Sequence, residues 1–238
     1  MEIFKRYEGT KEFYRVEDGV TTIMDNAFYD KGFLIELTLP ESVDSIGDYA
    51  FKLCFKLTHI TLPKKVRHFG TGVFQQCHGL KKVDLPYGVE KIDSGMFLSC
   101  TSMEELTIPS TVKEIDPSAF AVCRSLERIH CDDRVFSLIP EGKKLAAAMT
   151  YLKDENEDGE EAYSYLSSRE EEALDWMLQQ KEEGIFRKLL SKCDYSIVQK
   201  ERLMDCCRSR GREDLSGVIL DSQKNIQKED PFDMDPFA

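Results

Sequence analysis

The chain has 238 residues, of which 41% are hydrophobic and 10% aromatic, enough to bury a substantial core in one or two domains. Its 44 acidic and 32 basic side chains give a net charge of −12, which argues against non-specific binding to nucleic acid or to anionic membranes. The sequence holds no apolar run of the ~18 residues that a membrane span needs. It shows no secretory signal at its start, so we expect a cytoplasmic protein.

The first half of the chain repeats itself every 23 residues. Proline marks the period at Pro40, Pro63, Pro86 and Pro109. Other columns keep the same step, among them an Ala-Phe pair with cysteine three residues later, as in Ala50, Phe51 and Cys54. An earlier copy lacks the proline and the cysteine but keeps the apolar positions. We therefore expect five repeats over about residues 16–131, in a domain that spans residues 1–138.

One such repeat cannot bury its own apolar side, but stacked repeats place identical positions above one another and form a continuous core. Leu57, Ile60 and Leu62 predict a short strand that ends at the proline, which donates no ladder hydrogen bond. The Ala-Phe pair and the cysteine predict a helical turn or irregular arc on the other side. The expected fold is a solenoid of short parallel strands spaced about 4.8 Å apart.

The repeat pattern IPxxVxxIxxxAFxxCxxLxxI, which reads IPSTVKEIDPSAFAVCRSLERI from Ile108 to Ile129, resembles the BspA-like class of bacterial leucine-rich repeats. The resemblance implies a leucine-rich solenoid used for protein binding or adhesion, with no catalytic residues to transfer. Many members of this class are surface or secreted proteins.

From Pro140 onward the 23-residue period stops and helical patterns take over. The segment KKLAAAMTYLK at 143–153 predicts a helix, and the breaks at Gly184 and Gly211 predict further antiparallel helices. We expect an all-α C-terminal domain over residues 139–227, which covers the apolar layer of the last repeat as solenoid caps do. The fold class is therefore α+β, a leucine-rich repeat solenoid followed by helices.

Residues 228–238 hold too few core-type side chains to fold, and we expect a flexible acidic tail. The tail repeats Asp-Pro-Phe, so Phe232 and Phe237 are candidate anchors for docking into a partner. The alternative is a coincidence in a segment of biased composition.

The cysteine column invites a disulfide or zinc interpretation. Side chains in one column point the same way, however, and they neither face each other nor converge tetrahedrally. Free cysteine packs well as a small hydrophobic residue. We therefore expect buried thiols and a reducing compartment.

Asp154, Asn156, Asp158 and Gly159 match the opening of a calcium-binding loop. Tyr165, however, stands at the twelfth position, where a bidentate glutamate should close the site. A solvated acidic loop without calcium is the expected alternative. The four histidines lack the spacing of a nucleophile-base pair or of a metal motif. We therefore expect no enzyme activity, no cofactor and no metal.

Alternation along the strands exposes two files of side chains on a regular, rigid face. The first file comprises Glu36, His59, Lys82, Glu105 and Arg128. The second comprises Thr38, Thr61, Asp84, Thr107 and His130. Solenoids bind partners with such faces, so we expect a non-catalytic protein-interaction module or scaffold whose partner the sequence does not identify. The alternatives are an exported adhesin or host-interaction protein of the same repeat class, and a face that is merely solvated.

Overall fold

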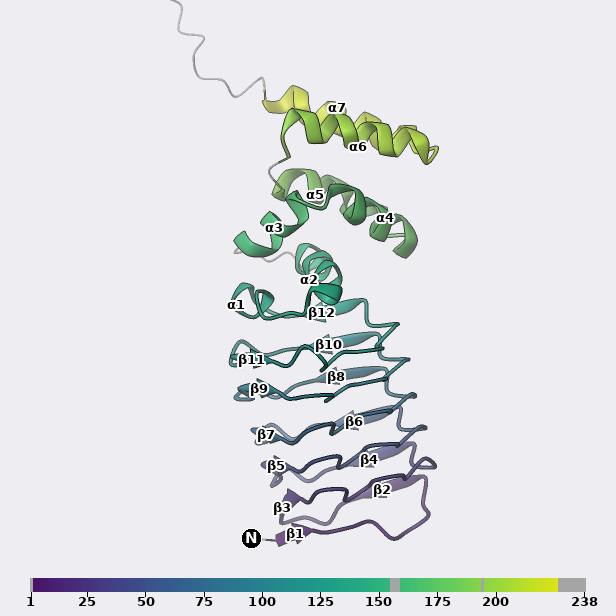
Figure 1. The fold of residues 1–238 in the computed structure, drawn as a ribbon, viewed down its shortest axis with the longest axis vertical. Helices are drawn as coiled ribbons and strands as arrows, with labels where there is room; N and C mark the ends of the chain where they lie inside the picture. Colours follow the sequence, from purple (N-terminus) through teal and green to yellow (C-terminus); the bar gives the residue numbers. More distant parts are fainter. Residues whose placement is uncertain (1, 155–158, 194, 227–238) are drawn as a thin grey trace, which may run out of the picture. The chain divides into compact units, whose positions relative to one another are not determined.

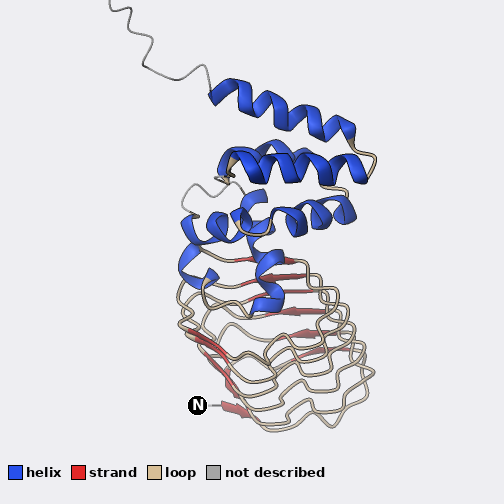
Figure 2. Ribbon diagram, turned by 45° about the horizontal axis from the view of Figure 1, so that its top comes forward, coloured by secondary structure: helices blue, strands red, loops and turns tan. Residues whose placement is uncertain are grey.

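The computed structural model describes residues 2–154, 159–193 and 195–226 (Figure 1). Their contacts divide the chain into two compact units, one that ends at Asp154 and one that begins at Glu155. The first unit holds the strands and the second is helical, as the colouring in Figure 2 shows. The expected combination of a repeat solenoid and a helical C-terminal region is confirmed.

Each turn of the solenoid, called a rung below, carries two short parallel strands. The front strands are β2 (Phe13–Arg15), β4 (Glu36–Thr38), β6 (His59–Thr61), β8 (Lys82–Asp84), β10 (Glu105–Thr107) and β12 (Arg128–His130). The back strands are β1 (Glu2–Phe4), β3 (Val20–Ile23), β5 (Ser45–Ile46), β7 (His68–Phe69), β9 (Lys91–Ile92) and β11 (Glu114–Ile115). Pairing keeps the sequence period, since Leu37 lies opposite Ile60. The short strands alternate with turns, as the proline period predicts.

The expected number of five repeats is wrong, because the solenoid has six front strands. β2 pairs in register with β4, which places Phe13 opposite Glu36 and Tyr14 opposite Leu37. This first rung has an aromatic side chain where the later rungs have an aliphatic one. The stretch of chain before β2 also lacks the proline, Ala-Phe and cysteine marks, so the repeat pattern did not reveal this strand.

The core of the solenoid is a stack of phenylalanine rings. Ring centroids lie 5.5 Å apart between Phe28 and Phe51, and 5.3 Å apart between Phe51 and Phe74. The stack continues to Phe97 and Phe120. Identical side chains stack because the 23-residue step puts each ring above its predecessor. Burial of each ring removes a large apolar area from water and stabilises the fold by roughly 1.5–3 kcal/mol before the entropy cost of ordering.

The cysteine column consists of free thiols, and all four members are buried. Each sulfur donates to the backbone carbonyl of a phenylalanine in the preceding rung. Cys54 Sγ lies 3.2 Å from the Phe28 oxygen, and Cys123 Sγ lies 2.9 Å from the Phe97 oxygen. The prediction of buried thiols is confirmed, and the bond explains why a residue that is both small and a weak donor recurs here.

Two helices of the first unit follow the last strand, α1 (Asp133–Phe136) and α2 (Glu141–Lys153). α2 packs against β12, where the Thr150 hydroxyl accepts from the Ile129 backbone N–H at 3.2 Å. Lys143 Nζ donates to the carbonyls of Cys123 (2.6 Å) and Leu126 (3.0 Å). α2 thus packs against the last rung, and its polar side chains form hydrogen bonds with the backbone of that rung. The contacts group this helix with the solenoid, whereas the sequence assigned it to the helical domain.

The second unit contains α3 (Glu160–Ser167), α4 (Glu170–Gln180), a 3₁₀ turn η1 (Glu183–Ile185), α5 (Phe186–Lys192), α6 (Ile197–Ser209) and α7 (Glu213–Ile226). Ser196 and Gln199 form a capping box that satisfies backbone donors at the start of α6. Gly211, with φ of +70°, follows its end. Leu174, Leu203 and Ile219 are fully buried, so amphipathic helices supply this core.

Candidate protein-binding face

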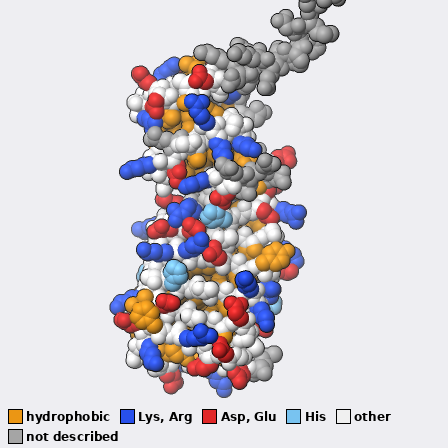
Figure 3. Space-filling view, turned by 180° about the vertical axis from the view of Figure 1, so that it is seen from behind, with side chains coloured by type: hydrophobic (Ala, Val, Ile, Leu, Met, Phe, Trp, Pro, Cys, Tyr) orange, Lys and Arg blue, Asp and Glu red, His pale blue; other side chains and the backbone are white. Residues whose placement is uncertain are grey.

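The front strands present their outward side chains in straight files, because the strands pair without a register shift. All of the predicted binding residues lie in these files and are exposed or half-buried. On the side of the molecule seen in Figure 3, acidic and basic side chains are interspersed, and hydrophobic ones form small separate patches. The face divides into two panels that differ in how its side chains are paired.

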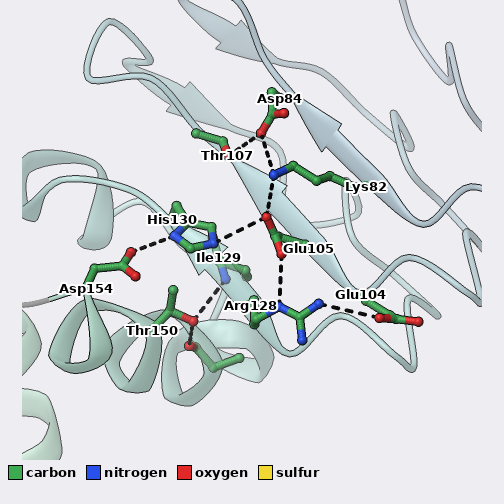
Figure 4. Close-up of polar contacts among 11 residues, drawn as sticks. Lys82, Asp84, Glu104, Glu105, Thr107, Arg128, Ile129, His130, Thr150 and Asp154 are labelled. Atoms are coloured by element: carbon green, nitrogen blue, oxygen red, sulfur yellow. Dashed lines mark hydrogen bonds and ion pairs between the residues drawn. The ribbon is translucent and has the colours of Figure 1, made fainter. Parts of the chain in front are cut away.

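Side chains of β8, β10 and β12 form the charged panel, in which they pair with one another (Figure 4). Lys82 Nζ lies 2.6 Å from Glu105 Oε1, and Arg128 Nε donates to Glu105 Oε2 at 3.0 Å. The hydrogen bond from Lys82 lowers the pKa of Glu105, and the same bond raises the pKa of Lys82. Thr107 donates its hydroxyl to Asp84 on the neighbouring strand. Cross-strand pairs of this kind stabilise the sheet.

His130 ends the charged panel and contacts two carboxylates. Its Nδ1 lies 2.6 Å from Asp154 Oδ2, and its Nε2 lies 3.7 Å from Glu105 Oε1. Asp154 follows the last residue of α2, so this contact joins the helix that covers the last rung to the front face. A histidine expected to meet a partner is therefore engaged within the protein itself.

The open panel consists of the outward side chains of β2, β4 and β6. Phe13, Glu36 and His59 stand in one file, and the side chain of Phe13 is 61% exposed. In the described part of the chain, neither Glu36 nor His59 takes part in an ion pair. Phe55, on the turn that leads into β6, is 41% exposed and stacks on His78 with ring centroids 5.3 Å apart. Exposed aromatic side chains are enriched at the centres of protein interfaces.

A hollow of about 190 Å³ lies between the two panels. It is lined by His59, Ile60, Thr61, Lys82 and Asp84. Among the described strands, β6 and β8 belong to separate sheets, whereas β4 pairs with β6 and β8 with β10. The hollow therefore marks an interruption of the front sheet.

Sequence reasoning missed Phe13 and Phe55 as candidate binding residues. Phe13 lies one period before Glu36, so one further step of the repeat would have found it. Phe55 lies on a turn and outside the strand files, and nothing in the repeat pattern singles it out. The tail anchors Phe232 and Phe237 lie outside the described residues.

Of the segment that resembles the opening of a calcium loop, Asn156 and Asp158 lie outside the described residues. Asp154, its first position, carries the carboxylate that contacts His130. Within residues 2–154, 159–193 and 195–226, no group of three or more His, Cys, Asp or Glu side chains is placed to hold a metal ion. Of the helices that the structure describes, none has both the length and the apolar character needed to cross a bilayer.

Comparison with known proteins matches residues 10–139 to the BspA type leucine rich repeat region, in six copies. A leucine rich cell surface protein from Faecalibacterium prausnitzii A2-165 has a similar structure, with 31% identity, a TM-score of 0.54, and coverage of 57% of this chain and 37% of that one. The leucine-rich repeat protein of T. pallidum shows 29% identity, a TM-score of 0.45, and coverage of 58% and 75%.

A leucine-rich repeat protein from Bacteroides ovatus ATCC 8483 shows 23% identity, a TM-score of 0.43, and coverage of 52% of this chain and 38% of that one. No curated protein matches the chain. The family model covers more than half of the chain and counts the same six rungs as the structure. The chain therefore belongs to the BspA-type leucine-rich repeat family.

Proposed function

We propose that the protein is a non-catalytic interaction module that binds a protein partner on the front strands, chiefly through the open panel. Support comes from the file of Phe13, Glu36 and His59, which combines an exposed ring with two polar groups that form no ion pair within the described residues. A file of this kind loses little backbone freedom on binding, because the parallel strands already hold its backbone.

The charged panel is the weaker contact region. Lys82 and Arg128 both form ion pairs with Glu105. A partner gains binding energy from these three side chains only if it replaces the ion pairs with equivalent contacts of its own. Exposed ion pairs contribute little to affinity, whereas aromatic anchors contribute most of the energy at interfaces. Binding energy is therefore expected to concentrate on the open panel and on the adjacent Phe55–His78 stack.

Capture from an extract of the source cell tests this proposal with two matched histidine variants. His59 lies on front strand β6, and His68 lies on back strand β7 of the same solenoid; both are exposed. We expect His59→Glu combined with Phe13→Ala to lose a partner that the wild-type chain captures. His68→Glu should retain it. Equal capture by both variants would contradict binding at the open panel.

We further propose that the protein works in a reducing compartment, the cytoplasm. The four buried thiols of the repeat column are free, as are the other cysteines of the chain. Small disulfide-stabilised proteins are typical of oxidising compartments instead. Cell fractionation tests the location, and recovery of the protein in the soluble cytoplasmic fraction is the expected result.

A second candidate is an adhesin or host-interaction protein at the cell surface, favoured by the 31% identity with a protein described as a cell surface protein. The same front face would then bind a host protein. Protease treatment of intact cells separates the two. Degradation of the chain under conditions that spare a cytoplasmic marker would support the surface candidate and contradict the cytoplasmic one.

A further inference from the structure

The solenoid is interrupted at one step, between its third and fourth rungs. Among the described strands, no ladder joins β6 to β8 on the front or β7 to β9 on the back. All other successive front strands pair, as do all other successive back strands. Two independent columns of strands therefore separate at the same place, so the interruption is common to the front and the back of the solenoid.

Individual backbone bonds show the interruption residue by residue. Just before most front strands, a backbone N–H donates to a carbonyl of the preceding rung. Thr58 donates to the Ile35 carbonyl at 3.0 Å, and Glu104 donates to the Lys81 carbonyl at 2.8 Å. In the described structure Lys81, the equivalent donor at the interruption, makes no such bond.

The back column repeats this pattern. Arg67 donates to Asp44 (2.9 Å) and Lys113 donates to Glu90 (2.8 Å), whereas Glu90 itself donates to no carbonyl of the rung before it within the described residues. Asp93 likewise lacks the bond that Gly70 and Asp116 make. The third and fourth rungs thus leave backbone donors unpaired on both sides.

The arc that joins front and back strands stays bonded across the same step. Gly72 N–H donates to the Ser94 carbonyl at 2.9 Å, and Phe74 N–H donates to the Met96 carbonyl at 2.8 Å. The rings of Phe74 and Phe97 remain stacked, with centroids 5.5 Å apart. One side of the cross-section is therefore closed while the two strand columns are open, which is the geometry of a hinge.

Side-chain size differs at the open back column. The position that is isoleucine in four of the back strands is Phe69 in β7, and Phe4 holds it at the start of the column in β1. Phe69 lines a hollow of about 580 Å³ between β7 and β9, together with Arg67, His68, Gly88, Glu90 and Lys91. Phe69 is half-buried and still pairs with Ile46 of β5, so its larger ring leaves less room only on the side of β9.

The backbone of the arc is most permissive at the same two rungs. One arc position has positive φ in four rungs and is Asn26 (+57°), Tyr49 (+54°), Gly72 (+58°) and Gly95 (+59°). Glycine adopts and leaves this region at little cost, whereas a residue with a Cβ is held there only by its surroundings. The two glycines flank the interruption, where bending requires the backbone to adjust.

We infer that the solenoid bends at a built-in hinge between its third and fourth rungs. The two bonded arc segments, residues 72–76 and 94–98, form the pivot, and Phe69 is the wedge that keeps the strand columns apart. The open panel lies on one side of this hinge and the charged panel on the other. Bending changes the curvature of the front face without disturbing either three-rung half. The inference concerns the solenoid itself and holds whether or not the front face binds a partner.

Amide hydrogen exchange of the full-length chain, followed residue by residue by NMR, tests the hinge. Protection factors correct for the intrinsic rate of each amide, and local opening lowers them below the global value. We expect the amides of Lys81, Glu90 and Asp93 to be at least about tenfold less protected than their bonded equivalents. These equivalents are Thr58 for Lys81, Lys113 for Glu90 and Asp116 for Asp93. The arc amide of Phe74 should be as protected as that of Phe51. Equal protection of open and bonded positions would overturn the hinge.

The variant Phe69→Ile tests the wedge. With isoleucine restored to the column, protection at Glu90 and Asp93 should rise about tenfold while Thr58 stays unchanged. Ile92→Val, a small change in the same column beyond the hinge, is the control and should not raise protection at Glu90. Unchanged protection at both open positions in a folded Phe69→Ile protein would overturn the role of Phe69.

Discussion

Cys100 Sγ donates to the backbone carbonyl of Phe74 at 3.0 Å, and the same bond joins each cysteine of the column to the phenylalanine of the preceding rung. The cysteine therefore performs two tasks, since it fills a small space beside the ring stack and adds a thiol bond to a buried carbonyl that also accepts a backbone N–H, as Phe74 does from Cys77 at 3.1 Å. The small volume and the weak donor together account for the strict period of this residue.

Replacing Cys100 separates these two tasks. Cys100→Ala removes both volume and donor and is expected to destabilise the solenoid by about 1–3 kcal/mol, since the Phe74 carbonyl keeps its bond from the Cys77 N–H. Cys100→Ser keeps a donor of nearly the same size and is expected to cost less. Urea denaturation of both variants measures the difference. A serine variant that is less stable than the alanine variant would show that the bond to Phe74 contributes little.

Thiol titration makes the solenoid lose stability at high pH. Burial raises the pKa of Cys54 from an ordinary 9.0 to about 12, and burial likewise raises the pKa of Cys77 and Cys100. The unfolded chain therefore releases these protons at lower pH than the folded one. The stabilisation is complete below about pH 9 and is lost as pH rises toward 12.

Thermal unfolding between pH 7 and pH 11 measures this loss. The melting temperature should be nearly constant up to pH 8.5 and then fall, and the fall should be shallower in Cys54→Ser. If the melting temperature falls as steeply with pH in the serine variant as in the wild type, then other groups cause the loss of stability at alkaline pH.

Glu105 makes the charged panel sensitive to acid. Its pKa is lowered first by the hydrogen bond from Lys82, so its contribution to stability is present above the ordinary value of 4.5 and is lost as pH falls. Glu105→Gln should lower the melting temperature at pH 7 and have a smaller effect as the pH falls below 4.5. Because the pairs are partly exposed, the effect at pH 7 should be below about 1 kcal/mol and should shrink in 1 M salt.

The double mutant Glu105→Gln with Arg128→Gln, compared with the two single variants, measures the coupling energy between Glu105 and Arg128. If the two single changes add, then Glu105 and Arg128 are not coupled, against the 3.0 Å contact between them.

Lys143 stabilises the end of the solenoid through two carbonyls of the last rung, at Cys123 and Leu126. Lys143→Met keeps the apolar stem but removes both donors, so we expect a loss of about 1–3 kcal/mol in unfolding free energy. Lys144→Met is the matched control, because among the residues that the structure describes Lys144 pairs with the exposed Glu141 at 3.6 Å and with no carbonyl of the last rung. Chemical denaturation measures both, and equal losses would contradict the role of Lys143.

The repeat columns predicted the fold because every rung places the same side chains in the same layer. Phe51 and Cys54 have buried equivalents through Phe120 and Cys123. The sequence did not predict the first front strand because Tyr14 replaces an aliphatic residue and the proline, Ala-Phe and cysteine of the repeat are absent before it. The grouping of α2 with the solenoid depends on the contact of Thr150 with Ile129, which no local pattern encodes.

The candidate face was predictable in its position but not in its chemistry. Alternation placed Glu105 and Arg128 outward, which the structure shows. Their pairing depends on rotamers and on the distance between strands, and the sequence alone does not determine these. The interruption between β6 and β8 was also hidden, since the period of 23 residues runs through it unchanged and Phe69 is the one departure from isoleucine in the back-strand column between Ile23 and Ile115.

Hydrogen exchange of the chain with and without its captured protein partner tests the central claim most directly. A partner on the open panel should slow exchange in peptides that contain β2, β4 and β6, and leave those that contain β9 and β11 unchanged. Slowed exchange confined to the back strands or to α3–α7 would contradict binding on the front face.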